Sequence, residues 1–214
     1  MLREELQEIL LRQRKITDEK LIKRDVSLDD EGGFVVCLTG IRRCGKSTLL
    51  KQEFFEDSYY INFDDERFLN FEVNDFSVMY ELLFELFGEK KYFVLDEIQN
   101  IKGWERFVRR LHNEKKKIFV TGSNASLLSR EFGTHLTGRN TTVELYPFSF
   151  NEFIRFKGKN FDVSRLVAED RAEIKRLFSE YVDNGGFPEF LKTGKEEYLE
   201  ALYENILYKD IITR

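Results

Sequence analysis

Short apolar runs alternate with helically spaced apolar residues through the middle of the chain. The runs predict a buried strand at residues 34–38 and further strands at residues 59–63, 92–95, 118–120 and 141–145. The stretches between them predict helices at residues 46–55, 76–87, 104–111 and 127–132. Strands that alternate with helices and are apolar along their whole length are typical of a parallel sheet covered on both faces. The pattern therefore predicts an α/β fold.

Both ends of the chain lack strand signals. Apolar residues recur at helical spacing in MLREELQEILLRQRK, which predicts an N-terminal helical segment within residues 1–30. After Pro147 the sequence is divided into helical stretches by GKNFD, DNGGFP and KTGK. We therefore expect three parts: the N-terminal segment, an α/β core over residues 31–147 and a helical part over residues 148–214.

Composition narrows the class of protein. Of the 214 residues, 42% are hydrophobic and 34% are charged, which excludes a disordered or collagen-like chain. Two cysteines and two histidines are too few for a disulfide framework or a zinc ribbon. No apolar stretch approaches the roughly 20 residues that cross a bilayer, and the N-terminus has no apolar signal segment, so we expect a cytoplasmic protein without a membrane partner.

Charge gives little indication of a nucleic-acid partner. The net charge of −5 argues weakly against a surface that coats nucleic acid. The densest basic segment, RRLHNEKKK at residues 109–117, fits either a contact with a phosphate backbone or a solvated helix end. Nucleic-acid binding therefore stays open.

The most specific motif is GIRRCGKST, which lies between the predicted strand 34–38 and the predicted helix 46–55. It fits the pattern G-x-x-x-x-G-K-[ST], in which backbone amides and a helix N-terminus surround polyphosphate oxygens. In this pattern Lys46 reaches the β- and γ-phosphates, and the Ser47 hydroxyl binds Mg2+. The candidate nucleotide-binding residues are Gly40, Ile41, Arg42, Arg43, Cys44, Gly45, Lys46, Ser47 and Thr48.

The side chains at the variable positions of this loop have other expected roles. Arg42 and Arg43 either add positive charge near the nucleotide or, as is more usual at such positions, point outward to solvent or to a partner. Cys44 is expected to be a permissive loop residue, and Cys37 on the preceding strand a small core residue. The chemistry of the loop is thus expected from its backbone, Lys46 and Ser47.

A second motif, KYFVLDEIQ, places two carboxylates after the predicted strand 92–95. Ligands of open α/β sheets bind at the carboxyl ends of the strands. Asp96 is suited to bind Mg2+ as the partner of Ser47, and Glu97 to polarise a water molecule for attack on the γ-phosphate. The alternative is a solvated turn without a chemical role.

Polar residues also follow the predicted strand 118–120, in the segment TGSN. Thr121, Ser123 and Asn124 are expected at the same sheet edge, where a polar side chain can sense the γ-phosphate or orient the attacking water. Alternatively, an Asn or Ser here caps the predicted helix 127–132. Both roles can apply to different members of the set.

Arg139 lies in LTGRN, shortly before the predicted strand 141–145. One interpretation is a salt-bridged residue on the surface. The other is an arginine finger, which stabilises transition-state charge in a neighbouring subunit. The residues alone leave both open.

Five segments resemble, in the same order, the prokaryotic AAA-type ATPase family, which is common in archaea and pairs an ATPase core with a C-terminal domain of unknown function. GIRRCGKSTLL resembles its arginine-rich P-loop, and YINFDDERF the strand after its first helix. LDEIQNIKGWERFVRRL resembles its Walker B stretch. VTGSNASLLSREFGTHLTGRNTTVELYPFSFNEF resembles its sensor-to-lid stretch, and YVDNGGFPEFL its Gly-Gly-Phe-Pro segment. The resemblance covers residues 34–214.

The resemblance implies a five-stranded core in the order 5-1-4-3-2, with Walker A on the first strand, Walker B on the third and a helical lid after Pro147. It makes Ser123 the sensor candidate, with Asn124 next, and places Arg139 at the arginine-finger position. Family proteins continue past a segment that resembles ENILYKDIITR. We therefore expect the natural protein to continue beyond Arg214 into an output domain.

The expected function is Mg-dependent binding and hydrolysis of ATP, with the nucleotide state driving rearrangement of the lid or of a partner. ATP rather than GTP rests on the resemblance, and the chain has no NKxD-type segment that would read guanine. Expected partners besides ATP are further copies of the chain in a homo-oligomer and an unidentified protein. One alternative is a non-hydrolytic, nucleotide-gated scaffold or DNA-associated switch, and another is a small-molecule phosphotransferase.

Overall fold

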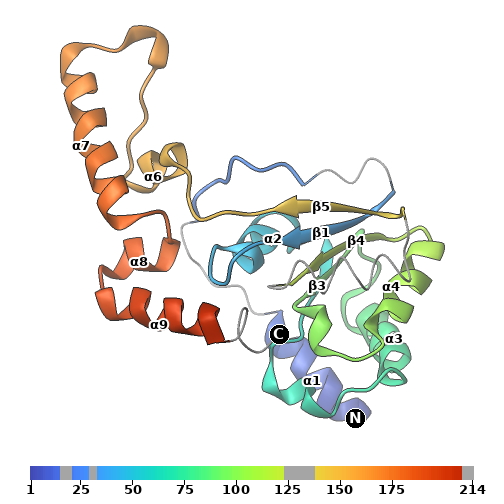
Figure 1. Ribbon diagram of the computed structural model, residues 1–214. Helices are drawn as coiled ribbons and strands as arrows, with labels where there is room; N and C mark the ends of the chain where they lie inside the picture. Colours follow the sequence, from blue (N-terminus) through green and yellow to red (C-terminus); the bar gives the residue numbers. More distant parts are fainter. Residues whose placement is uncertain (15–20, 29–32, 123–137, 209–214) are drawn as a thin grey trace. The chain divides into compact units, whose positions relative to one another are not determined.

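The computed structural model describes residues 1–14, 21–28, 33–122 and 138–208 of the chain (Figure 1). Contacts divide the chain into two compact units. The first unit comprises Met1–Glu19, Ser27–Gly40 and Lys46–Glu144, and it contains the sheet. The second comprises Lys20–Val26, Ile41–Gly45 and Leu145–Arg214. Residues Ile41–Gly45, which belong to the motif GIRRCGKST, are thus assigned to the second unit by their contacts.

The first unit is built on a parallel sheet with the strand order β2-β3-β4-β1-β5. The strands are β1 Val35–Thr39, β2 Ser58–Asn62, β3 Tyr92–Asp96, β4 Lys117–Thr121 and β5 Asn140–Glu144. Every strand that the apolar runs predict is present, displaced by one residue at most. The predicted α/β fold and the predicted strand order 5-1-4-3-2 are confirmed.

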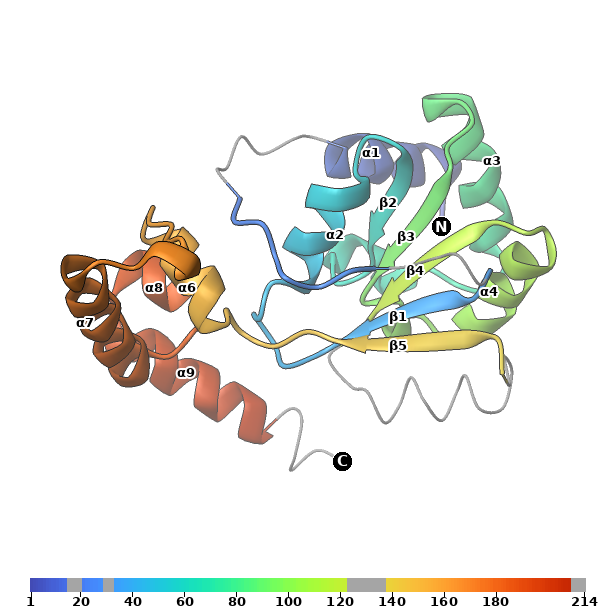
Figure 2. The same ribbon diagram turned by 90° about the horizontal axis from the view of Figure 1, so that it is seen from above.

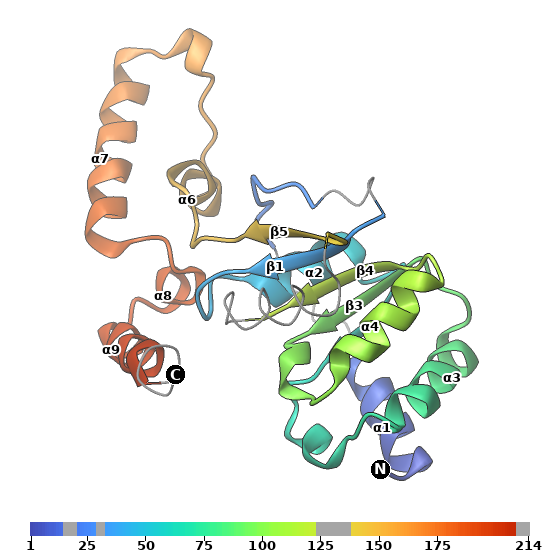
Figure 3. The ribbon, with the colours of Figure 1, turned by 45° about the vertical axis from the view of Figure 1, so that its right-hand side comes forward.

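Helices cover both faces of this sheet, because the side chains of a strand point alternately to opposite faces. Val35 and Cys37 of β1 belong to one core cluster with residues of α1 (Arg3–Gln13), α3 (Asp75–Phe87) and α4 (Trp104–Asn113). Figure 2 shows α1 beside α3, and Figure 3 shows α4 in front of the sheet and α2 behind it.

The opposite face of the sheet is covered by α2 (Lys46–Phe54), which follows the loop after β1. Leu49 and Leu50 of this helix are buried, and the Phe54 ring stacks on Phe119 of β4 with the ring centroids 4.1 Å apart. The N-terminal residue of α2 therefore lies at the edge of the sheet where β1 ends.

The second unit is helical after Leu145 in its described part. Its α-helices are α6 Phe150–Phe156, α7 Ala168–Asn184, α8 Pro188–Thr193 and α9 Glu196–Ile206. It also contains the short 3-10 helix η3 Val163–Arg165, whereas η1 Glu66–Asn70 and η2 Ile98–Asn100 lie in the first unit. The predicted helix 127–132 lies outside the described residues.

In the second unit, the backbone at Gly186 lies so close to the backbone at Phe148 that a glycine is required there. A Cβ on Gly186 would lie 2.2 Å from the carbonyl oxygen of Phe148, which also accepts a hydrogen bond from the Tyr181 hydroxyl at 2.8 Å. The Phe148 N–H donates to the Gly186 carbonyl at 2.7 Å. Only glycine fits here, so the segment DNGGFP holds the start of α8 against the connection into α6.

Among the described residues, no helix is long and apolar enough to cross a membrane.

Candidate functional site

The carboxyl ends of three neighbouring strands bring the candidate residues to one edge of the sheet. Leu38 pairs with Thr121, and Leu95 pairs with Val120, so the ends of β1, β4 and β3 lie side by side. The motif GIRRCGKST follows β1, and Asp96 ends β3. This is the edge at which open α/β sheets bind ligands.

The loop after β1 has a backbone that only certain residues adopt readily. Gly40 and Gly45 have φ angles of 140° and 103°, and Arg43 has a φ angle of 63°. Positive φ angles carry little steric cost for glycine but are strained for a residue with a Cβ. The loop leads into α2 at Lys46, which is 5% exposed and whose Nζ donates to the Gly40 carbonyl at 3.0 Å. The lysine ammonium is thus held across the mouth of the loop.

The Asp96 carboxylate is fully buried and is held through both of its oxygens. The Tyr60 hydroxyl donates to Oδ2 at 2.5 Å, and the Thr121 hydroxyl donates to Oδ1 at 2.5 Å. The Glu97 N–H in turn donates to Thr121 Oγ1 at 2.9 Å. Thr121 therefore fixes the aspartate and the start of the following turn together.

Tyr60 links the aspartate to the loop motif. Burial raises the pKa of Tyr60, and the nearby Asp96 carboxylate raises it further, so the phenol keeps its proton and remains a donor. The neighbouring Ser47 side chain lowers this pKa, but by less than burial and Asp96 raise it. Sequence reasoning missed Tyr60, although a tyrosine on a strand that is predicted to be part of the core was a signal that its buried oxygen needs a partner.

Glu97 has the left-handed backbone conformation at the end of β3, with a φ angle of 52°. Strained backbone of this kind is common at functional sites. Its side chain is partly buried, and Gln99 Nε2 donates to Glu97 Oε2 at 2.5 Å. The turn therefore directs Glu97 away from the course of the strand, and Gln99, which the sequence did not single out, holds its carboxylate.

The other loop residues differ in exposure. Ile41, Arg43 and Thr48 are exposed, and Arg42 is partly buried. The guanidinium carbon of Arg43 lies 5.4 Å from the ring centroid of Tyr198, within the second unit. The Cys44 side chain is completely buried. Cys44 was expected to be a permissive loop residue, and its complete burial means that it is not a solvent-exposed position of the loop.

Arg139 lies at the amino ends of the strands, whereas Asp96 lies at their carboxyl ends. It directly precedes β5, and its carbonyl accepts a hydrogen bond from the Val35 N–H at the start of β1 at 2.9 Å. A five-residue strand is about 16 Å long, which separates Arg139 from the end of β1 where the loop begins. The Arg139 side chain is exposed. Ser123 and Asn124 lie outside the described residues.

A buried arginine, Arg24, contacts the loop in the second unit. Arg24 Nη1 donates to the Cys44 carbonyl at 3.0 Å, and Nη2 donates to the Tyr146 carbonyl at 2.6 Å. Its Nε donates to Glu152 Oε1 at 2.9 Å, and its guanidinium carbon lies 5.0 Å from the Phe148 ring centroid. Sequence reasoning missed Arg24 because it lies in a mostly polar stretch, where a solvated arginine is the usual outcome.

The oxygen ligands at this edge fit a magnesium ion that is bound together with a polyphosphate. Mg2+ is commonly held by one or two carboxylates and the substrate phosphates rather than by a cage of protein ligands. Among the described residues, no group of three or more His, Cys, Asp or Glu side chains could hold a metal ion. Ser47 and Asp96, which both lie beside Tyr60, supply one hydroxyl and one carboxylate.

Comparison with known families and proteins gives a consistent result. A family model described as an AAA domain matches residues 33–154, which is more than half of the chain. The chain is 34% identical to an uncharacterised protein of Methanocaldococcus jannaschii and 35% identical to one of Haemophilus influenzae. These alignments cover 97% and 93% of this chain but 49% and 51% of those proteins. The chain thus spans about half the length of the curated relatives it matches.

Two solved structures are also similar. AMPPCP-bound DnaA from Aquifex aeolicus is 16% identical with a TM-score of 0.37, over 81% of this chain and 62% of that chain. C. elegans PCH-2 is 14% identical with a TM-score of 0.37, over 77% and 49%. At these TM-scores neither likeness carries an argument about function.

Proposed function

The chain belongs to the AAA domain family, and on that premise we propose that it binds Mg·ATP at the loop Gly40 to Thr48 and hydrolyses it. The observation that carries this proposal is the sheet edge at which Lys46, Asp96 and Thr121 meet the end of β1. A phosphate-binding loop beside a buried carboxylate and a hydroxyl is the arrangement that phosphoryl transfer requires.

Lys46 and the loop amides neutralise the phosphates. In the proposed complex the Lys46 ammonium exchanges the Gly40 carbonyl, 3.0 Å away, for oxygens of the β- and γ-phosphates. Ser47 and Asp96 hold Mg2+, which supplies charge stabilisation to the transferring phosphoryl group. Because Tyr60 and Thr121 hold both oxygens of Asp96, the carboxylate needs little reorganisation to act.

Glu97 is proposed as the residue that accepts a proton from the attacking water. It lies next to Asp96 but leaves the strand in a left-handed turn, so the two neighbouring carboxylates have different roles. Ser123 is the proposed γ-phosphate sensor, with Asn124 as the second candidate.

Arg139 is proposed to act on the nucleotide of a neighbouring copy. A homo-oligomer is part of this proposal, because Arg139 lies at the amino end of β5 whereas the candidate site lies at the carboxyl ends of the strands. We further propose that the nucleotide state drives rearrangement of the helical part after Pro147 or of a protein partner.

Substitution of Lys46 tests the nucleotide site. Lys46→Ala should weaken Mg·ATP binding about 10- to 150-fold, because a charged hydrogen bond to phosphate is worth about 1.5–3 kcal/mol. Isothermal titration calorimetry of the wild type and the variant measures this. Lys102→Ala, an exposed lysine in the turn before α4, is the matched control and should bind as the wild type does. Equal affinity of Lys46→Ala and the wild type would contradict the assignment of the loop.

A further inference from the structure

The carbonyl group that Arg24 holds belongs to the phosphate-binding loop. Cys44 immediately precedes Gly45, and its carbonyl accepts from Arg24 Nη1 at 3.0 Å. A peptide group is planar and trans, so its C=O and its N–H point in opposite directions. A fixed Cys44 carbonyl therefore also fixes the direction of the Gly45 N–H.

The Gly45 N–H is one of the groups on which the loop depends. In the G-x-x-x-x-G-K-[ST] pattern, backbone N–H groups of the loop surround the phosphates, and Gly45 directly precedes Lys46. The guanidinium lies against this part of the backbone, since a Cβ on Gly45 would be 3.1 Å from Arg24 Nη1. Arg24 thus contacts the Cys44–Gly45 peptide group from the side opposite to the Gly45 N–H.

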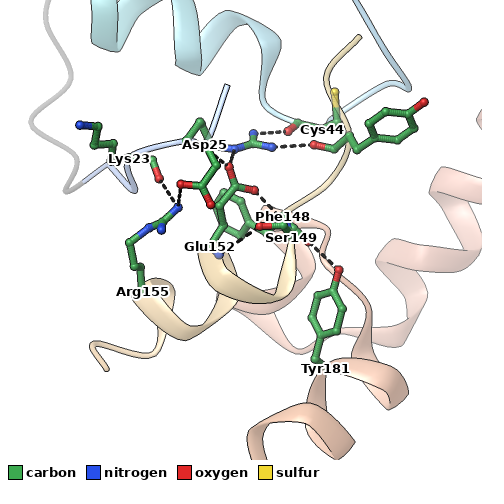
Figure 4. Close-up of polar contacts among 10 residues, drawn as sticks. Lys23, Asp25, Cys44, Phe148, Ser149, Glu152, Arg155 and Tyr181 are labelled. Atoms are coloured by element: carbon green, nitrogen blue, oxygen red, sulfur yellow. Dashed lines mark hydrogen bonds and ion pairs between the residues drawn. The ribbon is translucent and has the colours of Figure 1, made fainter. Parts of the chain in front are cut away.

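Glu152 orients the Arg24 guanidinium. The side chains of Arg24 and Glu152 are only 5% and 3% exposed, and their salt bridge is 2.9 Å long. Glu152 also accepts hydrogen bonds from the Asp25 N–H at 2.7 Å and the Ser149 N–H at 2.8 Å (Figure 4). Burial raises the pKa of Glu152, but the hydrogen bonds from Arg24, Asp25 and Ser149 outweigh it and leave that pKa below its ordinary value. The buried pair is therefore fully charged at neutral pH.

The contacts require an arginine. Its planar fork reaches three acceptors at once, namely a carboxylate, the Cys44 carbonyl and the Tyr146 carbonyl. A lysine presents a compact ammonium that cannot span the same acceptors in a fixed plane. Two of the three acceptors are backbone carbonyls, so the side chain fixes backbone geometry as well as pairing with a charge.

We propose that Arg24, oriented by Glu152, is a positioning residue of the phosphate-binding loop that keeps the Gly45 N–H directed toward bound phosphate. The inference rests on the proposed binding of nucleotide at this loop. It adds a residue from the segment before β1, outside the motif itself, to the determinants of phosphate affinity.

Two readouts of the Arg24→Lys variant test this role. Its affinity for Mg·ATP by calorimetry should fall about 10-fold, the effect of one lost charge-assisted hydrogen bond. The amide resonance of Gly45 in the nucleotide-free, 15N-labelled protein should shift, which a general loss of stability would not produce at this position selectively. Arg155→Lys is the matched control, because Arg155 bonds to Asp25 and to the Lys23 carbonyl of the same segment. It should leave both readouts unchanged.

The outcomes separate this inference from the proposed function. A folded Arg24→Lys variant with wild-type affinity and an unshifted Gly45 resonance would overturn the positioning role. If the wild type itself does not bind Mg·ATP, the proposed function fails, whereas the Gly45 resonance still reports on the loop. Should Arg24→Lys not fold, Glu152→Gln keeps the arginine and removes the charge that orients it. Unchanged affinity and resonance in folded Glu152→Gln would likewise contradict the proposal.

Discussion

The Glu97→Gln variant should bind Mg·ATP as tightly as the wild type and release phosphate about 100- to 10,000-fold more slowly, the usual contribution of a general base. The amide has nearly the size and shape of the carboxylate, but it cannot accept a proton from water. We expect this effect at Glu97 rather than at Asp96 for two reasons. The left-handed turn directs Glu97 away from the strand, and both oxygens of Asp96 are already held by Tyr60 and Thr121.

Binding and turnover are measured separately for this variant, by calorimetry and by phosphate release at saturating ATP. Glu89→Gln, which changes an exposed glutamate in the connection between α3 and β3, is the control and should turn over normally. Wild-type phosphate release by Glu97→Gln would mean that Asp96 and Glu97 form only a structural turn.

The Arg139→Ala variant should lose about 1,000- to 100,000-fold in turnover, because an arginine finger neutralises transition-state charge. Arg139 and the loop lie at opposite ends of β1 and β5, so we expect Arg139 to act on the nucleotide of a neighbouring copy and not on its own. The wild type should therefore be slow when dilute, and its specific activity should rise with protein concentration.

A mixing experiment tests action between subunits. Arg139→Ala and Glu97→Gln, each inactive alone, should regain partial turnover when combined, because one subunit brings an intact Glu97 and its neighbour an intact Arg139. Co-purification through two different affinity tags shows that mixed oligomers have formed. Absence of turnover in such oligomers, or full activity of Arg139→Ala alone, would assign Arg139 to the surface.

The sheet could be predicted from the sequence because a strand is recognised from residues that are adjacent in the chain. β1, β3 and β4 are buried along almost their whole length and are therefore short apolar runs, which differ from the helical spacing of their neighbours. β5, by contrast, is largely exposed. The motif around Lys46 could be predicted for the same reason, because its glycines and its lysine are close together in the chain, directly between a strand and a helix. Asp96 and Glu97 were found for the same reason.

The contacts that position these residues could not be predicted because they join distant parts of the chain. Tyr60 and Asp96 are 36 residues apart, and Arg24 and Glu152 are 128 residues apart. The residues next to such a side chain in the sequence show no pattern that would reveal its partner. Arg24 in particular lies in a polar stretch, where a solvated arginine is the usual outcome.

Phosphate release by the wild-type chain tests the central claim most directly. The protein is incubated with ATP and Mg2+ at several protein concentrations, with water as the only acceptor, and orthophosphate and ADP are quantified. We expect equal amounts of both products, a rate that depends on Mg2+ and stops in EDTA, and no product from Lys46→Ala at the same ATP concentration. Absence of orthophosphate from folded protein that binds ATP, or its appearance only after a small-molecule acceptor is added, would contradict the account.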